Sequence, residues 1–444
     1  MLESRDRRVA ILGVAIDNLT MDQVLDTLEA QIAEGGFHQI ATANVDFVIR
    51  SVRDEELREA LNRCDIVLAD GMPLVWASRL LGVRLKERVA GADLVPRLAK
   101  LSAQHGYRIF LLGASEESSA GTAAWMQKNF PSVCIAGRHS PRFQPLEEMD
   151  HEDILARIEE AWPDILLVAF GNPKQEKWLA MHRHRLKVPV CIGVGGSFDF
   201  LSGGIRRAPV WMQRSGMEWL YRTIQEPSRL AVRYFSNAAG LLRYLPAQLV
   251  ATAIQARRRS HVQITKETIG PAKVFRIQGS FTGALLPRFE ADVRCEILAG
   301  SHVVLDLSET VYIGADALGT LIRLLGTVRR WKRELWLAGL QPPLLKVVRA
   351  ARLGPSFRIV PHVPEALRRI EPEQLPVPLF EEDCAFFRIG GKLVRIKTRQ
   401  MPEVFSQVQM LLEQRMTGEP ISVMSSDSQE QNALAQELLP ADSA

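Results

Sequence analysis

A glycine turn followed by a run of arginines is the part of the sequence best suited to bind a charged ligand. A short apolar strand is expected over residues 188–194, and Gly195 and Gly196 follow it. Because glycine has no Cβ, the backbone there can turn sharply and approach a ligand closely. Guanidinium groups come next, at Arg206, Arg207, Arg214, Arg222, Arg229 and Arg233, with acids only at Glu218 and Glu226. This combination favours a ligand that carries phosphates, and also a membrane surface.

A buried strand, a loop and a solvated basic helix would explain the same residues, and composition does not decide between the two interpretations. A second pattern favours a site. Polar residues and glycines fall just after predicted strands, at Thr42, Asn44, Asp70, Gly113, Gln175, Gly195 and Asp199. Each one alone is more often a turn or cap residue. Together they predict a single site, because ligands of parallel α/β sheets bind beyond the carboxyl ends of the strands.

The elements that must position these residues are apolar strands alternating with amphipathic helices. Strands are expected at 8–16, 38–43, 66–68, 107–112, 133–137, 164–170 and 188–194. Thr20 is the expected N-cap of the first helix. The alternation predicts an α/β fold of Rossmann-like type, with a mainly parallel sheet covered on both faces.

The basic residues in excess are concentrated in one segment of the chain. Its 444 residues suggest two or three domains. Residues 203–260 contain ten arginines and two glutamates, whereas the rest of the chain contains 45 basic and 49 acidic residues. This argues for an anionic partner at one place and against general nucleic-acid binding.

Five dispersed cysteines support neither a zinc site nor a disulfide framework, which fits a reducing cytosolic compartment. Residues 234–254 suggest an interfacial helix, not a span, because Arg243 and Pro246 lie at their centre.

Six ordered motifs within residues 8–245 resemble the WecG/TagA/CpsF family of bacterial glycosyltransferases. They are TANVDF, ADGMPLV, ERVAGADL, FGNPKQEKW, GVGGSFDFLSGGIRRAP and GMEWLYRTIQEPSRLAVRY. The resemblance implies transfer of a sugar of N-acetylmannosamine type from a UDP-sugar donor to a polyprenyl-diphosphate-linked acceptor in surface polysaccharide or exopolysaccharide biosynthesis. It also implies inversion at the anomeric carbon with no metal and no other cofactor. The sequence agrees, since no D-x-D pair precedes residue 245. Glycine-turn N–H groups and arginines would then balance the charge of the leaving diphosphate.

The resemblance also assigns roles to residues. Asp70 matches the family's proposed catalytic base, which inverting transfer needs at the acceptor hydroxyl. The alternatives are a turn role for Asp70 and Glu176 as a weaker rival base. Substrate-binding matches are Thr42, Asn44, Arg88, Gln175, Arg222, Arg229 and Arg233. Donor binding is expected at Gly113, Gly193, Gly195, Gly196 and Asp199, although an aspartate after a glycine turn often caps the next helix.

The second half resembles a STAS domain, the anti-sigma-factor-antagonist type, most clearly in VVLDLSETVYIGADALGTLIRLL at residues 303–325. Signalling members carry a phosphorylatable Ser or Thr at the start of this helix, but the matching positions here are Gly314 and Ala315, so a binding or scaffolding role is expected. The expected organisation is a glycosyltransferase α/β domain at 1–205, an Arg-rich helical appendage at 206–256, a linker at 257–272, the STAS-like domain at 273–371, a hairpin plus helix at 372–417 and a disordered tail at 418–444.

The resulting hypothesis is an enzyme peripheral to the inner, cytoplasmic face of the cell membrane. Its expected partners are the UDP-sugar, the lipid-linked acceptor, an anionic membrane surface and a protein that binds the STAS-like domain. A regulatory adaptor that binds a nucleotide sugar and acts through that domain is the alternative. A Rossmann oxidoreductase is a weaker one, because no GxGxxG follows the first strand.

Overall fold

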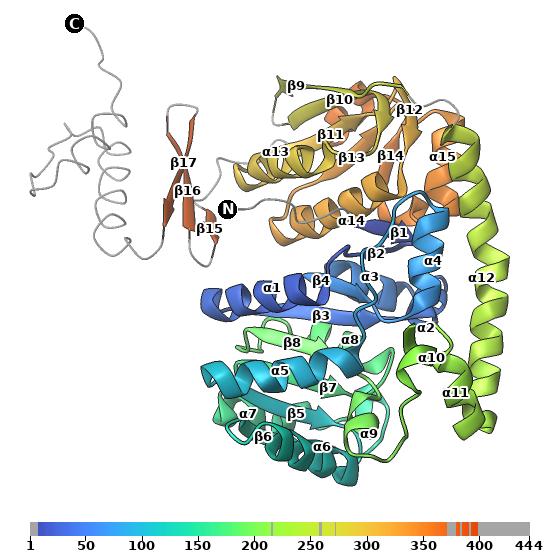
Figure 1. Cartoon of the computed structure of the whole chain (residues 1–444). Helices are drawn as coiled ribbons and strands as arrows, with labels where there is room; N and C mark the ends of the chain where they lie inside the picture. Colours follow the sequence, from blue (N-terminus) through green and yellow to red (C-terminus); the bar gives the residue numbers. More distant parts are fainter. Residues whose placement is uncertain are drawn as a thin grey trace, which may run out of the picture.

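The computed structural model describes residues 8–370, apart from 215, 257–259, 271 and the side chains of 210, 214 and 229, and the backbone of three strands between 379 and 397. The chain forms two α/β domains, joined by a long helix that runs beside both (Figure 1).

The first domain contains a six-stranded sheet in the order β4-β3-β8-β7-β5-β6, and every neighbouring pair is parallel. The predicted parallel α/β fold is therefore confirmed. The strands are almost entirely buried apolar runs, as expected for a sheet covered on both faces. Their bounds are β3 (His38–Ala43), β4 (Ile66–Ala69), β5 (Arg108–Gly113), β6 (Cys134–His139), β7 (Ile165–Ala169) and β8 (Val190–Gly193).

Helices cover both faces of this sheet. One face packs against α1 (Met21–Glu34), α5 (Gly91–His105), α6 (Glu116–Asn129) and α9 (Ser197–Leu201). The other packs against α2 (Val45–Ser51), α3 (Glu55–Arg63), α4 (Met72–Leu80), α7 (His151–Ala161) and α8 (Lys174–Met181). The predicted N-cap is confirmed, since Thr20 Oγ1 accepts from the backbone N–H of Gln23 at 3.3 Å and Gln23 Oε1 accepts from that of Thr20 at 3.1 Å. This reciprocal pair fixes the start of α1.

The N-terminal segment is not the single strand that was expected over residues 8–16. It is an antiparallel hairpin of β1 (Val9–Ile11) and β2 (Val14–Ile16), turned at Leu12 and Gly13, which have φ of 48° and 93°. Its two faces join different cores: Ala10 and Ala15 pack with the second domain, and the other hairpin apolar side chains pack with the first. The hairpin thus lies between the domains (Figure 1).

The second domain contains strands in the order β12-β10-β11-β13-β14, all parallel to their neighbours, with β9 antiparallel at β10. The strands are β9 (Gln263–Ile269), β10 (Ala272–Phe281), β11 (His302–Asp306), β12 (Thr310–Ile313), β13 (Leu335–Ala338) and β14 (Arg358–Val360). The helices are α13 (Leu286–Leu298), α14 (Ala315–Arg330), α15 (Pro342–Ala350) and α16 (Val363–Arg369). The predicted linker is wrong for residues 263–269, because β9 is part of the sheet. Its mostly exposed polar residues are typical of an edge strand.

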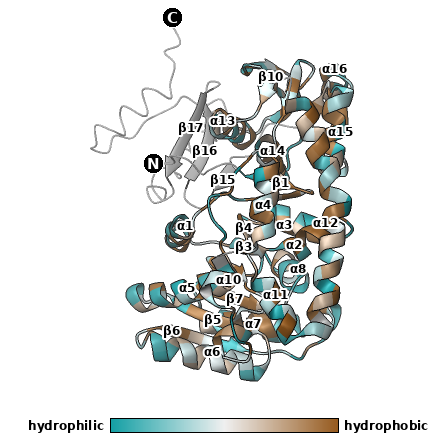
Figure 2. Ribbon diagram, turned by 45° about the vertical axis from the view of Figure 1, so that its right-hand side comes forward, coloured by the Kyte–Doolittle hydropathy of each residue, from teal (hydrophilic) through white to brown (hydrophobic). Residues whose placement is uncertain are grey.

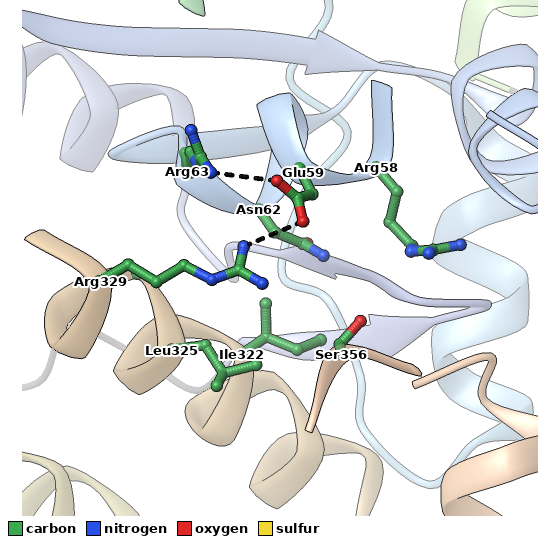
Figure 3. A pocket seen from close by; sticks show the side chains of 9 residues that line it. Arg58, Glu59, Asn62, Arg63, Ile322, Leu325, Arg329 and Ser356 are labelled. Atoms are coloured by element: carbon green, nitrogen blue, oxygen red, sulfur yellow. Dashed lines mark hydrogen bonds and ion pairs between the residues drawn. The ribbon is translucent and has the colours of Figure 1, made fainter. Parts of the chain in front are cut away.

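Helix α14 is the main contact of the second domain with the hairpin. A Cβ at Gly319 would lie 2.7 Å from the backbone oxygen of Arg8, so only glycine fits at this crossing. Beside it, a small pocket opens between α3 and α14 (Figure 3). Glu59 spans the pocket, with its carboxylate 3.0 Å from Arg63 and 3.4 Å from Arg329. The pocket belongs to the domain junction and not to the ends of the parallel strands.

The Arg-rich region folds as helices, as predicted: α10 (Val210–Arg214), α11 (Glu218–Gln225) and α12 (Pro227–Ala256). Gln248 fixes α12 to the hairpin, since its amide donates to Ala10 O at 2.9 Å and accepts from the backbone nitrogen of Leu12 at 3.1 Å. The helix exposes an apolar stripe, formed by Val232, Phe235, Leu242, Val250 and Ile254. Figure 2 shows hydrophobic and hydrophilic segments mixed along α12. Over the residues that the structure describes, no helix is long and apolar enough to cross a bilayer.

Beyond residue 370 the structure describes β15 (Leu379–Glu381), β16 (Cys384–Ile389) and β17 (Lys392–Lys397). The hairpin expected around residues 390 and 391 is confirmed by the antiparallel pairing of β16 with β17. The helix expected after residue 400 and the expected tail lie outside the described residues.

Candidate active site

Asp70 and the glycine turn lie at the same edge of the first sheet. The carboxylate of Asp70, just after β4, accepts from the backbone nitrogen of Gly91 at 3.4 Å. A Cβ at Gly91 would lie 3.0 Å from Ser197 Oγ and 3.4 Å from Val194 O, so the start of α5 fits closely between Asp70 and the loop after β8. The sheet order agrees, because β3 alone separates β4 from β8.

The environment of Asp70 sets its protonation. Burial raises its pKa to about 7; the charge of Arg88 opposes this shift and that of Glu218 adds to it. The side chain is half-buried. A carboxyl group with a pKa near neutrality can accept a proton at physiological pH and release it afterwards, which is what a general base requires.

Thr42 and Asn44 lie at the end of β3, and their side chains bind backbone groups of the protein. Thr42 Oγ1 donates to the backbone oxygen of Gly193 at 2.8 Å, which ties β3 to the end of β8. Asn44 is the N-cap of α2, and its Oδ1 accepts from the backbone nitrogen of Asp46 at 2.9 Å. Its Cβ lies 3.8 Å from where a Cβ of Gly71 would stand. Both residues therefore lie near Asp70, and their sugar-binding roles stay predictions.

Gln175 joins two loops of the site. Its Oε1 accepts from the backbone nitrogens of Gly171 and Gly195, each at 3.1 Å, and its Nε2 donates to Glu176 Oε1 at 2.7 Å. The side chain is 1% exposed. In this arrangement Gln175 shapes the loops, and the N–H of Gly195 is already used by a protein acceptor.

Glu176 is the rival base, and its surroundings disfavour that role. Its carboxyl lies against Gly193, where an added Cβ would come within 2.6 Å of Oε1. Burial raises the pKa of Glu176 to about 8, although the hydrogen bond from Gln175 opposes the shift. A carboxyl that keeps its proton at pH 7 and is 1% exposed cannot readily take a proton from a substrate.

Arg88 belongs to a ring of four charges, named here the four-charge ring, with Asp93, Arg207 and Glu218. Arg88 lies 3.0 Å from Asp93 and 3.0 Å from Glu218. Arg207 lies 2.7 Å from Asp93 and 3.4 Å from Glu218. Each carboxylate thus uses one oxygen for each guanidinium. The ring connects the strand-bearing core to the appendage next to Asp70.

The remaining residues that were predicted to bind substrate or donor fall into two groups. A Cβ at Gly196 would lie 3.7 Å from the carboxylate of Asp199 and 3.9 Å from Arg222 Nη2, so these three gather at the turn. Arg222 lies over the ring of Phe200, 4.8 Å from its centre, and Asp199 accepts from Ser118 Oγ at 2.8 Å.

Gly113 is different, because a Cβ there would lie 2.8 Å from Phe170 Cδ1. Strand packing alone therefore explains this glycine. Arg233, by contrast, lies over the ring of Tyr234, 5.4 Å from its centre. The side chain of Arg229 lies outside the described residues.

Several residues of the site had no role assigned to them from the sequence. Gly91, Asp93 and Ser118 position the predicted residues, and Arg207 and Glu218 close the four-charge ring. Four of the five lie inside the motifs quoted above, so the charges of Asp93, Arg207 and Glu218 were visible. Their pairing was not, because Arg88 and Glu218 are 130 positions apart. Over the described part of the chain, no three His, Cys, Asp or Glu side chains gather as a metal site would.

Comparison with known families agrees with this architecture. Residues 9–255 match the family described as "Glycosyl transferase WecG/TagA/CpsF family", and residues 263–366 match the STAS domain. The chain belongs to the WecG/TagA/CpsF family of glycosyltransferases and carries a STAS domain after the family region. The enzyme class and both resemblances predicted from the motifs are confirmed.

Two relatives share the name N-acetylglucosaminyldiphosphoundecaprenol N-acetyl-beta-D-mannosaminyltransferase. The protein from Bacillus subtilis (strain 168) is 36% identical over 190 residues, which cover 43% of this chain and 72% of the relative. The protein from Staphylococcus aureus (strain MRSA252) is 31% identical over 229 residues, which cover 51% of this chain and 88% of the relative. Among solved structures, the unphosphorylated anti-sigma factor antagonist SpoIIAA is similar at 16% identity, with a TM-score of 0.23, over 24% of this chain and 95% of that chain.

Proposed function

We propose that this protein transfers a sugar of N-acetylmannosamine type from a UDP-sugar to a polyprenyl-diphosphate-linked N-acetylglucosamine acceptor, with inversion at the anomeric carbon and without a metal ion. The names of the two relatives support the transferred sugar and the acceptor. We add three features that these names do not state: the UDP group of the donor, the inversion and the independence from metal. The product would serve the synthesis of a surface polysaccharide.

The observation that carries the proposal is the half-buried carboxyl of Asp70, with a pKa of about 7, at the strand edge that faces the glycine turn. In the proposed step Asp70 takes the proton of the acceptor hydroxyl while that oxygen attacks the anomeric carbon. The bond to the diphosphate breaks on the opposite face, and UDP leaves with the bonding electron pair. One base suffices for this inverting displacement.

Arginines would balance the charge that develops on the leaving diphosphate. Arg88 lies beside Asp70, and Arg222 lies at the glycine turn near Gly196. Guanidinium groups bind phosphate oxygens with two parallel hydrogen bonds. They would do here what a metal ion held by a D-x-D pair does in other enzymes. The missing D-x-D before residue 245 supports the same division of roles.

The apolar stripe on α12 supports an association with the membrane surface, where a polyprenyl acceptor resides. Val232, Phe235 and Leu242 are exposed on one helix, which begins just after α11 and its Arg222. An amphipathic helix lies in the bilayer interface when its apolar face enters the acyl boundary. We place the enzyme at the inner face of the cell membrane, where nucleotide sugars are available.

A protein partner of the STAS domain would have to bind away from the start of α14. Ala315, Asp316 and Leu318 are buried there. Asp316 is held by Thr282 Oγ1 at 2.7 Å and by the backbone nitrogen of Gly283 at 3.0 Å. The adaptor alternative therefore loses the helix start as a docking surface, although it keeps the outer faces of the domain.

The test combines purified protein, UDP-N-acetylmannosamine and a short-chain polyprenyl-diphosphate N-acetylglucosamine. We expect a disaccharide product by mass spectrometry and stoichiometric UDP release. Asp70→Asn should lower turnover by about 10²–10⁴-fold, the usual contribution of a general base. The matched control is Asp22→Asn on the exposed side of α1. Undiminished turnover in Asp70→Asn would exclude Asp70 as the base, and absence of product with any UDP-sugar would exclude the donor class.

A further inference from the structure

The four-charge ring has an unusual origin. Arg88 and Asp93 come from the core, on either side of Gly91, whereas Arg207 and Glu218 come from the appendage. Two guanidinium groups close to one another repel unless anions lie between them. Here the intervening anions are two carboxylates, and each carboxylate forms an ion pair with both arginines. The arrangement is therefore a two-arginine anion site that the protein's own acids occupy.

The two carboxylates differ in how firmly they are held. Asp93 lies in the first turn of the 15-residue α5, where a negative charge is stabilised by the helix dipole. Glu218 is the first residue of α11, an eight-residue helix with no buried residue among its members. Glu218 can therefore leave the ring without opening a core, whereas Asp93 cannot move without α5.

Arg207 also has unused capacity for hydrogen bonds. A guanidinium has five N–H donors in a planar fork, which matches two oxygens of one phosphate group. Arg207 makes its ion pairs through Nη1 and Nε, and its Nη2 is buried with no hydrogen-bond partner among the described residues. A buried donor without an acceptor is costly, so an added anion would be stabilised here.

We infer that Arg88 and Arg207 together bind the diphosphate of a substrate, and that Glu218 occupies this position until the diphosphate displaces it. The inference rests on the proposed function and adds Arg207 as a substrate-binding residue and Glu218 as an internal competitor. The shared chemistry is a diphosphate, which either the nucleotide donor or the lipid-linked acceptor supplies. Displacement of Glu218 would free α11 from the core at the moment of binding.

The experiment measures the affinity of UDP and, separately, of a short-chain polyprenyl diphosphate by isothermal titration calorimetry. Arg207→Gln should weaken binding roughly tenfold or more, since it removes a charge-assisted pair. Glu218→Gln should tighten binding several-fold, because the competing charge is gone. The control is Arg97→Gln on the exposed side of α5, which should alter neither affinity. The probe that shows the effect identifies the source of the diphosphate.

Two results would overturn the inference. Equal affinity of wild type, Arg207→Gln and Glu218→Gln for both probes would make the ring a structural clasp. Weaker binding in Glu218→Gln would mean that Glu218 builds the site and does not compete for it. Should Arg207→Gln fail to fold, Arg207→Lys keeps the charge and removes the fork, so it should still weaken binding. Transfer activity with unchanged affinities would refute only this inference, and the expected affinities without transfer would refute only the proposed function.

Discussion

Gln175 accepts a hydrogen bond from the backbone nitrogen of Gly195 at 3.1 Å, and through the same oxygen it holds Gly171. The loops after β7 and β8 are thereby fixed to each other by one buried amide. A residue expected to touch a sugar thus has a positioning role that is visible without any substrate.

Replacing Gln175 should therefore impair both stability and turnover. Gln175→Leu leaves the two backbone donors without their acceptor, and we expect about 1–3 kcal/mol loss in the free energy of unfolding. Urea denaturation measures this loss, and UDP release measures turnover. Gln104→Leu on the exposed side of α5 is the control. Unchanged stability with lost turnover would instead favour a direct contact between Gln175 and a sugar.

The activity of the enzyme should rise with pH through about 7, because the proposed base, Asp70, can act only when its carboxyl has lost its proton. Arg88 lowers the pKa of Asp70, so Arg88→Gln should move this rise in kcat/KM to higher pH. Glu218 raises that pKa, so Glu218→Gln should move the rise to lower pH. Profiles of kcat/KM between pH 5 and 9 (roughly two units either side of the pKa) measure both shifts. A profile that all three proteins share would show that another group controls the rate.

Glu176 should make the fold less stable at alkaline pH. Its pKa is about 8 in the folded protein against an ordinary value of 4.5, so the native state holds the proton more tightly than the unfolded state does. The contribution of Glu176 to stability is then fully present below pH 4.5 and is lost as the pH rises towards 8. Glu176→Gln should remove this fall and gain on the order of a few kcal/mol at the alkaline end. Urea unfolding across this range tests it, with Glu34→Gln on the surface of α1 as the control; a parallel fall in the variant would contradict the assignment.

The apolar stripe of α12 should determine binding to lipid vesicles. Phe235 is 79% exposed, so Phe235→Ser removes apolar surface without disturbing a core. Sedimentation with anionic vesicles should fall several-fold while the thermal midpoint stays the same. Phe143, which is 96% exposed and lies after β6, supplies the matched control Phe143→Ser. Equal sedimentation of the two variants would place the membrane contact elsewhere.

The sequence was informative where one local rule governs the structure. Apolar runs between amphipathic helices predicted the parallel sheet, and Thr20 followed by Gln23 matches a capping box that the structure contains. Asp70 could be placed beside the glycine turn, because the carboxyl ends of parallel strands share one edge. Its role as the base stays a prediction.

The remaining features depend on contacts that no local pattern encodes. Residues 9–16 are apolar on both faces because each face meets a different domain, so the segment looked like one buried strand. The strand β9 was missed because its edge position leaves polar residues exposed. The side chain of Gln175 binds backbone groups, and a sequence cannot distinguish such a bond from one to a ligand.

Helix α12 also constrains how the two halves of this protein can be joined. Its 30 residues correspond to a rod of about 45 Å, and Gly240 fits against Ile49 at one point while Gln248 is fixed to the hairpin at another. Inserting a single residue between these two points would rotate everything beyond it by about 100°. The two attachments could then no longer be satisfied together. A whole-turn insertion would restore the rotation but lengthen the helix by about 5.4 Å, so the two attachments fix both the orientation and the length of the segment between them.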